Sequence, residues 1–305
     1  MDIKNQYITE QVAMYCADTT EAIQTIKDNS IGLIVYSPPF SSLYTYSNSD
    51  RDLGNSRNDE EFFTHFNFIV KEMYRILMPG RIMAVHCMNI PAMKERDGYI
   101  GIKDFRGDLI RCFQKEGFIY HSEVTIWKNP VTEMQRTKAL GLLHKQIKKD
   151  SSKSRMGMPD YIVFMRKQGD NPKPITHTNE SYPVSLWQNV ASPAWEITPP
   201  VWDDINQSNT LNRMFSDEES EKHIAPLQLD VIERIINLYS CDDDVVFTPF
   251  MGIGSEVYQA AKMGRKAIGI ELKDVYFEQA VKNIHMLENE KNQMNIFDFI
   301  EASNN

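Results

Sequence analysis

The sequence predicts an α/β fold in which helices cover a mostly parallel β-sheet. Apolar, strand-like runs alternate along the chain with amphipathic, helix-like runs. Residues 31–36 (Ile-Gly-Leu-Ile-Val-Tyr) are apolar throughout, which is typical of a strand buried on both faces. Residues 244–271 combine a strand, a glycine turn, a helix and a second strand, the order of a parallel βαβ unit.

The other elements follow from the spacing of apolar residues. Short apolar runs predict strands, and apolar residues three or four positions apart predict helices, as in the segment that ends before Pro79-Gly80. The expected strands are residues 12–16, 31–36, 81–86, 118–127, 161–165, 245–248 and 266–270. The expected helices are residues 19–27, 58–77, 105–116, 226–239, 255–263 and 275–287. The last dozen residues are polar and rich in Asn, and we expect them to fray.

Composition limits the class of protein. The 305 residues are 42% hydrophobic and 25% charged, as in an ordinary globular protein with a substantial core. No stretch approaches the roughly 20 apolar residues of a membrane span, and the N-terminus lacks the pattern of a signal peptide, so we expect a cytoplasmic protein. The four cysteines are scattered without paired metal-ligand spacing, which indicates reduced, mostly buried thiols and no metal site. A homodimer is compatible with the sequence.

The glycine turn predicts a site for a nucleoside-type cofactor. Gly252 and Gly254 allow the backbone to approach a ligand, and the helix that follows offers free N–H groups to an anionic end such as a carboxylate. Glu271 ends the next strand, where an acid can accept hydrogen bonds from a ribose diol. Taken alone, the two glycines also fit an ordinary tight turn.

Ser37-Pro38-Pro39-Phe40, directly after the buried strand at 31–36, predicts a site for an amino-bearing planar ring. An exocyclic amine of a nucleobase is a poor nucleophile, because its lone pair is delocalised into the ring. Ser37 Oγ and the Pro38 carbonyl can accept hydrogen bonds from that amine, the prolines fix the turn, and Phe40 can stack on the base. The base must leave the duplex to be reached. In isolation the tetrapeptide is typical of an ordinary turn, and only its combination with the glycine turn favours methyl transfer. C5-cytosine chemistry is excluded because no cysteine follows a proline.

These residues together resemble the amino-methyltransferases that use S-adenosylmethionine (SAM) and modify exocyclic nitrogens of DNA bases. Ser37-Pro-Pro-Phe40 lies N-terminal to Pro-Phe-x-Gly-x-Gly at 249–254, the order of the β group, and the resemblance covers about residues 8–166 and 220–290. It implies a Rossmann-like, circularly permuted methyltransferase fold with a mostly parallel seven-stranded sheet and an irregular target-recognition insertion.

By similarity, the cofactor contacts extend along the chain. Phe250, Gly252 and Gly254 would line the methionine pocket, and Glu271 would bind the ribose. His223 and Pro226 match the segment that precedes the glycine turn in this family. Asp18 would lie near the adenine, and a helix N-cap is the alternative interpretation for Asp18.

Thr248 departs from the family pattern, which usually has Asp before Pro-Phe. That carboxylate contacts the amino end of SAM, so Thr248 implies weaker binding or a contact from elsewhere. The serine at position 37 favours cytosine N4 as the target; adenine N6, in DNA or RNA, is the alternative. A SAM-binding and nucleic-acid-binding module without catalysis is the alternative of a different class.

A basic segment predicts contact with double-stranded DNA despite the net charge of −9. Between residues 134 and 167, nine Lys or Arg against two acids give a balance of +7. A solvated charged loop is the alternative. The expected DNA contacts are Arg136, Lys138, Lys145, Lys148, Lys149, Lys153 and Arg155.

The sequence also suggests how the chain is divided. Residues 1–167 would form the catalytic half, residues 168–221 the target-recognition insertion, residues 222–290 the SAM-binding half, and residues 291–305 a tail. His86 and Cys87 end a strand at the same edge as Ser37, and we interpret them as buried packing residues.

Overall fold

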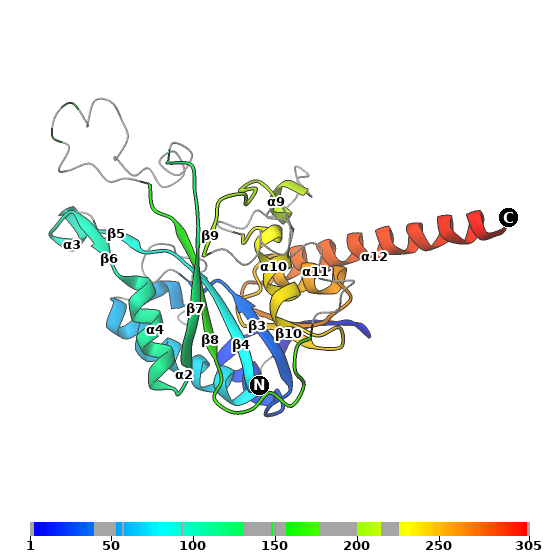
Figure 1. Cartoon of the computed structure of the whole chain (residues 1–305), viewed down its shortest axis with the longest axis horizontal. Helices are drawn as coiled ribbons and strands as arrows, with labels where there is room; N and C mark the ends of the chain where they lie inside the picture. The colour runs from blue at the N-terminus through cyan, green and yellow to red at the C-terminus, as the bar shows by residue number, and fades with distance from the viewer. Residues whose placement is uncertain are drawn as a thin grey trace.

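The computed structural model describes residues 3–39, 53–56, 58–92, 94–130, 148, 150, 157–176, 200–214 and 226–303 (Figure 1). Within these ranges a nine-stranded sheet has the order β1-β2-β11-β10-β3-β4-β8-β7-β9. Its strands are β1 Ile3–Ile8, β2 Val12–Ala17, β3 Ile31–Tyr36, β4 Leu77–Cys87, β7 Ile119–Ile126, β8 Asp160–Arg166, β9 Val201–Trp202, β10 Val245–Thr248 and β11 Lys266–Glu271. A separate small hairpin pairs β5 Ile90–Ala92 with β6 Gly101–Lys103.

The centre of the sheet is parallel, as the sequence predicts. β2, β11, β10, β3 and β4 run side by side in the same direction. β8 lies antiparallel between β4 and β7. These seven strands form the expected permuted sheet, and β1 and β9 add one strand at each edge. The carboxyl ends of the parallel strands therefore meet at one edge of the sheet, where ligands bind in open α/β sheets.

Helices cover both faces of the sheet (Figure 1). One apolar core lies under α1 Thr19–Ala22, α2 Asp59–Ile76 and α4 Phe105–Lys115. A second core lies under α10 Leu229–Tyr239, α11 Ser255–Lys262 and α12 Asp274–Ser303. Because each face of the sheet is buried, β3 has no exposed residue, which explains its continuous apolar sequence.

Local signals set the limits of the long helix α2. The Asn58 side chain accepts a hydrogen bond from the Glu61 N–H, which caps the helix at its first turn. Three acids occupy that first turn, and Arg75 occupies the last turn, in accord with the helix dipole. The helix ends at Ile76, just before the Pro79-Gly80 pair that predicts its end.

The structure differs from the sequence prediction in several places. The segment predicted as a helix at 19–27 forms only α1 and a 3₁₀ turn, η1 Ile23–Thr25. The hairpin β5–β6 and the edge strand β1 were not predicted, because these strands are short or mostly polar. The final helix, α12, continues to Ser303, where the sequence predicts fraying. Finally, part of the segment predicted as a separate insertion belongs to the sheet, since β9 pairs with β7 and Trp202 is buried.

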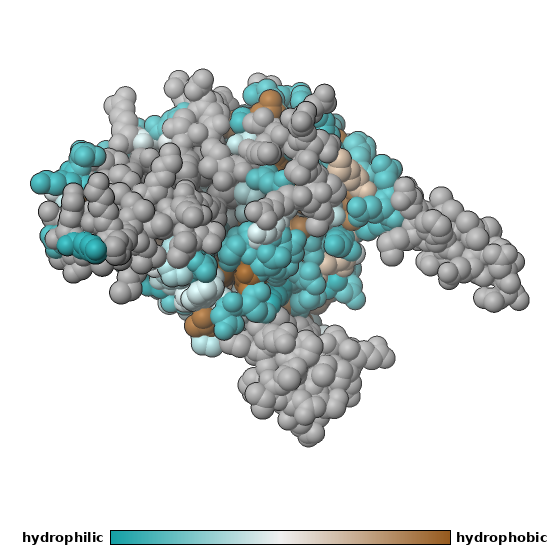
Figure 2. Space-filling model, turned by 90° about the horizontal axis from the view of Figure 1, so that it is seen from above, coloured by the Kyte–Doolittle hydropathy of each residue, from teal (hydrophilic) through white to brown (hydrophobic). Residues whose placement is uncertain are grey.

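The part of the surface that Figure 2 shows in colour is mainly hydrophilic, with small, separate hydrophobic patches. Further helices described are α3 Lys94–Asp97, α9 Leu211–Met214 and the 3₁₀ helix η3 Leu53–Asn55. Among the described residues, no helix combines the length and the apolar character that crossing a membrane requires.

Candidate active site

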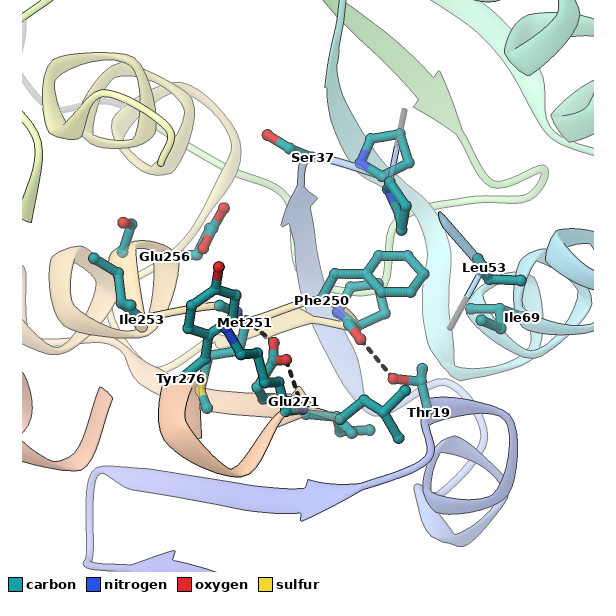
Figure 3. A pocket seen from close by; sticks show the side chains of 18 of the residues that line it. Thr19, Ser37, Leu53, Ile69, Phe250, Met251, Ile253, Glu256, Glu271 and Tyr276 are labelled. Atoms are coloured by element: carbon teal, nitrogen blue, oxygen red, sulfur yellow. Dashed lines mark hydrogen bonds between the residues drawn. The ribbon is translucent and has the colours of Figure 1, made fainter. Parts of the chain in front are cut away.

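A pocket opens at the carboxyl edge of the central strands (Figure 3). The ends of β2, β3, β10 and β11 and the first turn of α11 contribute to its wall. The lining includes eight residues predicted from the sequence, namely Asp18, Ser37, Pro38, Pro39, Pro226, Phe250, Gly252 and Glu271. The two motifs, far apart in the chain, therefore line one cavity.

The glycine turn after β10 adopts a backbone that only glycine takes without strain. Gly252 has φ 55° and Gly254 has φ 90°, and Gly254 is the N-cap residue of α11. A Cβ at Gly254 would lie 3.1 Å from the Ala280 Cβ. On β11, a Cβ at Gly269 would lie 2.4 Å from the Met251 sulfur, so β11 also requires a glycine where Met251 of the turn packs against it. The glycine turn is therefore closely packed against β11 and α12, and the N-terminus of α11 lies at the pocket.

Glu271 is fixed at the end of β11 by two backbone groups. Its Oε2 accepts a hydrogen bond of 2.7 Å from the Gly252 N–H, and its Oε1 accepts one of 2.9 Å from the Lys273 N–H. Figure 3 shows the carboxylate below Phe250, inside the pocket. The hydrogen bond to Gly252 links this acid to the glycine turn, so the two parts of the predicted cofactor site are held in one geometry.

Asp18 caps a helix and also lines the pocket. Its carboxylate accepts hydrogen bonds from the backbone N–H of Thr20, at 2.9 Å, and from the Thr20 hydroxyl, at 2.7 Å. The N-cap interpretation is therefore confirmed. The neighbouring Thr19 donates its hydroxyl to the Pro249 carbonyl at 2.6 Å, which ties this turn to the glycine turn.

Phe250 forms part of the floor of the pocket. Its ring packs against Phe66, with ring centroids 6.3 Å apart, and against Tyr36, at 5.8 Å. In Figure 3 it lies between Ser37 and Glu271. Phe250 therefore separates the Ser-Pro-Pro side of the pocket from the Glu271 side.

Glu256 is an acid in the pocket that the sequence prediction missed. It lies in the first turn of α11, lines the pocket and is only 5% exposed. Burial raises its pKa to about 8; its own backbone N–H opposes this rise, and the nearby charge of Glu271 adds to it. Thr248, by contrast, is buried at the end of β10 and is not among the lining residues, and its Oγ1 has no hydrogen-bond partner in the described part of the chain.

A chain of hydrogen bonds runs from Ser37 into the protein. The Ser37 Oγ lies 2.8 Å from the His86 Nδ1, and the His86 Nε2 lies 2.9 Å from the Asp160 Oδ2. The Lys128 ammonium lies 2.6 Å from that same Oδ2. All four residues come from adjacent strands or their ends, since β3, β4, β8 and β7 are neighbours in the sheet.

The register of the sheet explains how this chain forms. Tyr36 on β3 is opposite Val85 on β4, so the next residues, Ser37 and His86, emerge side by side. β8 begins at Asp160 and runs antiparallel to β4 beside His86. His86 is buried, as expected, but it also contacts Ser37, which the sequence prediction missed. Strand register could have suggested this pair, but the antiparallel return of β8 could not be inferred.

Asp160 is a buried carboxylate with two charged or polar partners. Burial alone would raise its pKa, but the attraction of Lys128 and His86, with their hydrogen bonds, holds the pKa below its usual value. Burial raises the pKa of the adjacent Cys87 thiol well above its usual range, so Cys87 stays a neutral packing residue.

Several predicted residues fall outside the described part of the chain. These are Phe40, His223, Arg136, Lys138, Lys145, Lys149, Lys153 and Arg155. Of the predicted DNA contacts, Lys148 is described, and it is exposed in a turn. At the end of the basic segment, Lys167 is buried and its ammonium donates a hydrogen bond to the Leu77 carbonyl at 2.7 Å. The ammonium of Lys167 therefore stabilises the fold.

Comparison with known proteins decides the family. The family model N6_N4_Mtase, described as DNA methylase, matches residues 31–282. The chain belongs to this DNA methylase family. It is a DNA amino-methyltransferase, and its cofactor is SAM.

Known proteins and solved structures resemble most of this methyltransferase. The type II methyltransferase M.MjaI of Methanocaldococcus jannaschii is 23% identical over 272 residues, which span 81% of this chain and 82% of that protein. The cytosine-N4-specific PvuII DNA methyltransferase has a similar structure, with TM-score 0.64 and 20% identity over 92% of this chain and 90% of that one. A Thermus thermophilus protein solved with SAM has TM-score 0.62 and 21% identity, over 91% of this chain and 95% of that one.

Proposed function

We propose that this methyltransferase transfers the methyl group of SAM to the N4 amine of a flipped-out cytosine in double-stranded DNA. The observation that carries the proposal is the position of Ser37. Ser37 directly follows β3 and lines the same pocket as Glu271 and the glycine turn. A hydroxyl and the Pro38 carbonyl offer two neutral acceptors for the two hydrogens of an exocyclic amine.

The choice of cytosine rests on the serine. A neutral serine gives weaker electrostatic help than an aspartate, and the serine form of the motif resembles the N4-cytosine enzymes. The PvuII enzyme, whose fold this chain shares, is cytosine-N4-specific, which is consistent with this choice. Phe40, predicted to stack on the base, provides no hydrogen-bond discrimination between cytosine and adenine, so the size of the pocket would select the ring.

We propose that different pocket residues bind different parts of SAM. When bound, SAM supplies an electrophilic methyl group. The fixed Glu271 carboxylate is suited to the ribose diol, and the N-terminus of α11 is suited to the methionine carboxylate. Pro226, Phe250, Gly252 and Gly254 would shape the walls around the methionine, and Asp18 would border the adenine.

Glu256 would replace the missing contact to the ammonium of SAM. Thr248 carries no charge and is not a lining residue, whereas the Glu256 carboxylate is buried at the pocket wall near the N-terminus of α11. Figure 3 shows Glu256 on the side of the pocket opposite Leu53 and Ile69. An ammonium group beside it would favour the ionised carboxylate, because an opposite charge at close range lowers the pKa of an acid.

The basic segment is proposed to bind the phosphate backbone of DNA. Its lysines and arginines would hold the duplex while the base is flipped, and the segment 168–221 would read the sequence around the target.

Mass spectrometry of nucleosides tests the proposed function. DNA from cells that express the protein should contain N4-methylcytosine, and DNA from cells that express the Ser37→Ala variant should contain at least about ten-fold less. N6-methyladenine that disappears with Ser37→Ala would retain the reaction and refute the choice of base. Calorimetric binding of SAM without any methylated base would instead identify a binding module that lacks catalysis.

A further inference from the structure

We propose that His86, supported by Asp160 and Lys128, orients the Ser37 hydroxyl and takes its proton after methyl transfer. The inference deepens the proposed function and rests on it. The three interactions run in series from the pocket into the core, from Ser37 to His86 at 2.8 Å, from His86 to Asp160 at 2.9 Å and from Lys128 to Asp160 at 2.6 Å.

The partners of His86 determine where its hydrogen lies. Asp160 is an ionised carboxylate that can only accept, so the His86 Nε2 carries the hydrogen and donates it. In the neutral ring, Nδ1 is then an acceptor, and the Ser37 hydroxyl donates to it. The Ser37 hydrogen is therefore directed away from the pocket, and the lone pairs of Oγ are available to an amine.

Lys128 is a second partner of the Asp160 carboxylate. Its ammonium lies 2.6 Å from the same oxygen that the His86 Nε2 contacts, and Lys128 is only 9% exposed. Opposite charges attract strongly where water is excluded, so Lys128 holds the carboxylate in place on the Nε2 side of the imidazole ring.

The proton then has a complete route. Formation of the new N–C bond uses the lone pair of the amine, and the electron pair of the broken S–C bond stays on sulfur. The amine nitrogen becomes positively charged and loses one hydrogen to the Ser37 Oγ, while the hydroxyl hydrogen of Ser37 moves to the His86 Nδ1. The products are the methylated neutral base and a protonated His86 that faces Asp160. The same Ser–His–carboxylate order moves a proton in serine hydrolases, although Ser37 here forms no covalent bond.

Groups from four neighbouring strands or their ends surround His86. Ser37 faces it from the end of β3, Asp160 from β8 and Lys128 from the segment after β7, while Cys87 is its neighbour on β4. Farther out, the ion pair of Arg106 with Glu123 contributes opposite charges. The His86 Nδ1 is therefore the acceptor on the Ser37 side of the ring, and Asp160 and Lys128 lie on its Nε2 side.

A double-mutant cycle is the kinetic test. His86→Asn keeps an acceptor oxygen near the Nδ1 position but cannot take the proton, so the single-turnover rate should fall by at least about ten-fold. Combined with Ser37→Ala, it should add less than about two-fold, because His86 acts through Ser37. If the losses of the two single variants instead multiply in the double variant, the proposal is overturned.

A matched control comes from a second Ser–His contact. His121 Nδ1 lies 2.8 Å from Ser122 Oγ, but this pair is exposed on β7. His121→Asn should leave the single-turnover rate unchanged. Calorimetry with SAM should give the same affinity for all variants, which separates a loss of chemistry from a loss of folding.

Nuclear magnetic resonance tests the hydrogen-bond chain without any turnover. In ¹⁵N-histidine-labelled protein, the His86 resonances, assigned with His86→Asn, should show an unprotonated Nδ1 and a protonated Nε2 at neutral pH, and Ser37→Ala should shift the Nδ1 resonance. A protonated Nδ1, or no response to Ser37→Ala, would overturn the chain. If these resonances behave as expected but the protein methylates no DNA, the proposed function is wrong. The hydrogen bonds among Ser37, His86 and Asp160 would then be present without a role in methyl transfer.

Discussion

Glu256→Gln should make the ligand-free protein more stable at alkaline pH. The pKa of Glu256 rises from the ordinary 4.5 to about 8 through burial. Between these values the native state holds a proton that the unfolded state has lost. The free energy of unfolding therefore falls by about 1.4 kcal/mol for each pH unit, from about pH 5 to pH 8. Over the whole range the loss is on the order of 5 kcal/mol.

The assay is urea unfolding of the ligand-free protein at several pH values. The glutamine variant has no proton to lose, so its curve should lack this contribution, and the difference between parent and variant should widen up to about pH 8. Glu290→Gln, at an exposed acid on α12, is the control and should follow the parent. Parallel curves for the parent and Glu256→Gln would refute the reasoning.

Binding of SAM should show the opposite slope. If the ionised Glu256 holds the ammonium, the affinity should rise about ten-fold between pH 6 and pH 7, where the α-amino group of SAM is still protonated. Glu256→Gln should bind more weakly and lose this slope in calorimetry. A ligand without the amino group, such as methylthioadenosine, should bind the parent and the variant equally well. Equal slopes for the parent and the variant would remove Glu256 from the cofactor site.

Three further predictions follow. Glu271→Ala should weaken SAM binding by roughly 10- to 100-fold in calorimetry, because the ribose loses its hydrogen-bond acceptor, and an unchanged affinity would make this acid structural. Gly32→Ala should lower the free energy of unfolding by roughly 1–3 kcal/mol, since its Cβ would lie 2.5 Å from the Asp244 Cγ; an unchanged urea midpoint would contradict this steric clash. Replacing four lysines by glutamine should weaken binding to all DNA sequences alike and reduce the salt slope by roughly 0.9 for each phosphate that is no longer neutralised; an identical slope would place them in solvent. The four are Lys145, Lys148, Lys149 and Lys153.

Local patterns in the sequence were sufficient for much of the fold and for two motifs. The apolar run at 31–36 predicts β3, because a strand buried on both faces has no polar side to show. The glycines at 252 and 254 predict the cofactor turn, because their positive φ angles are strained for other residues. Ser37 and Glu271 could also be predicted from local sequence. Ser37 directly follows one predicted strand of the parallel sheet, and Glu271 ends another.

Only the tertiary structure decided which groups surround those motifs. His86, Lys128 and Asp160 belong to three different strands or strand ends, and their meeting behind Ser37 depends on the register and on the antiparallel β8. In the sequence, Glu256 is an ordinary acid in the first turn of a predicted helix. In the structure it lines the pocket, and burial raises its pKa. The sequence thus determined the elements and the residues at their ends, because those depend on neighbours along the chain. Burial, pKa and hydrogen-bond partners depend on neighbours in space, which only the tertiary structure brings together.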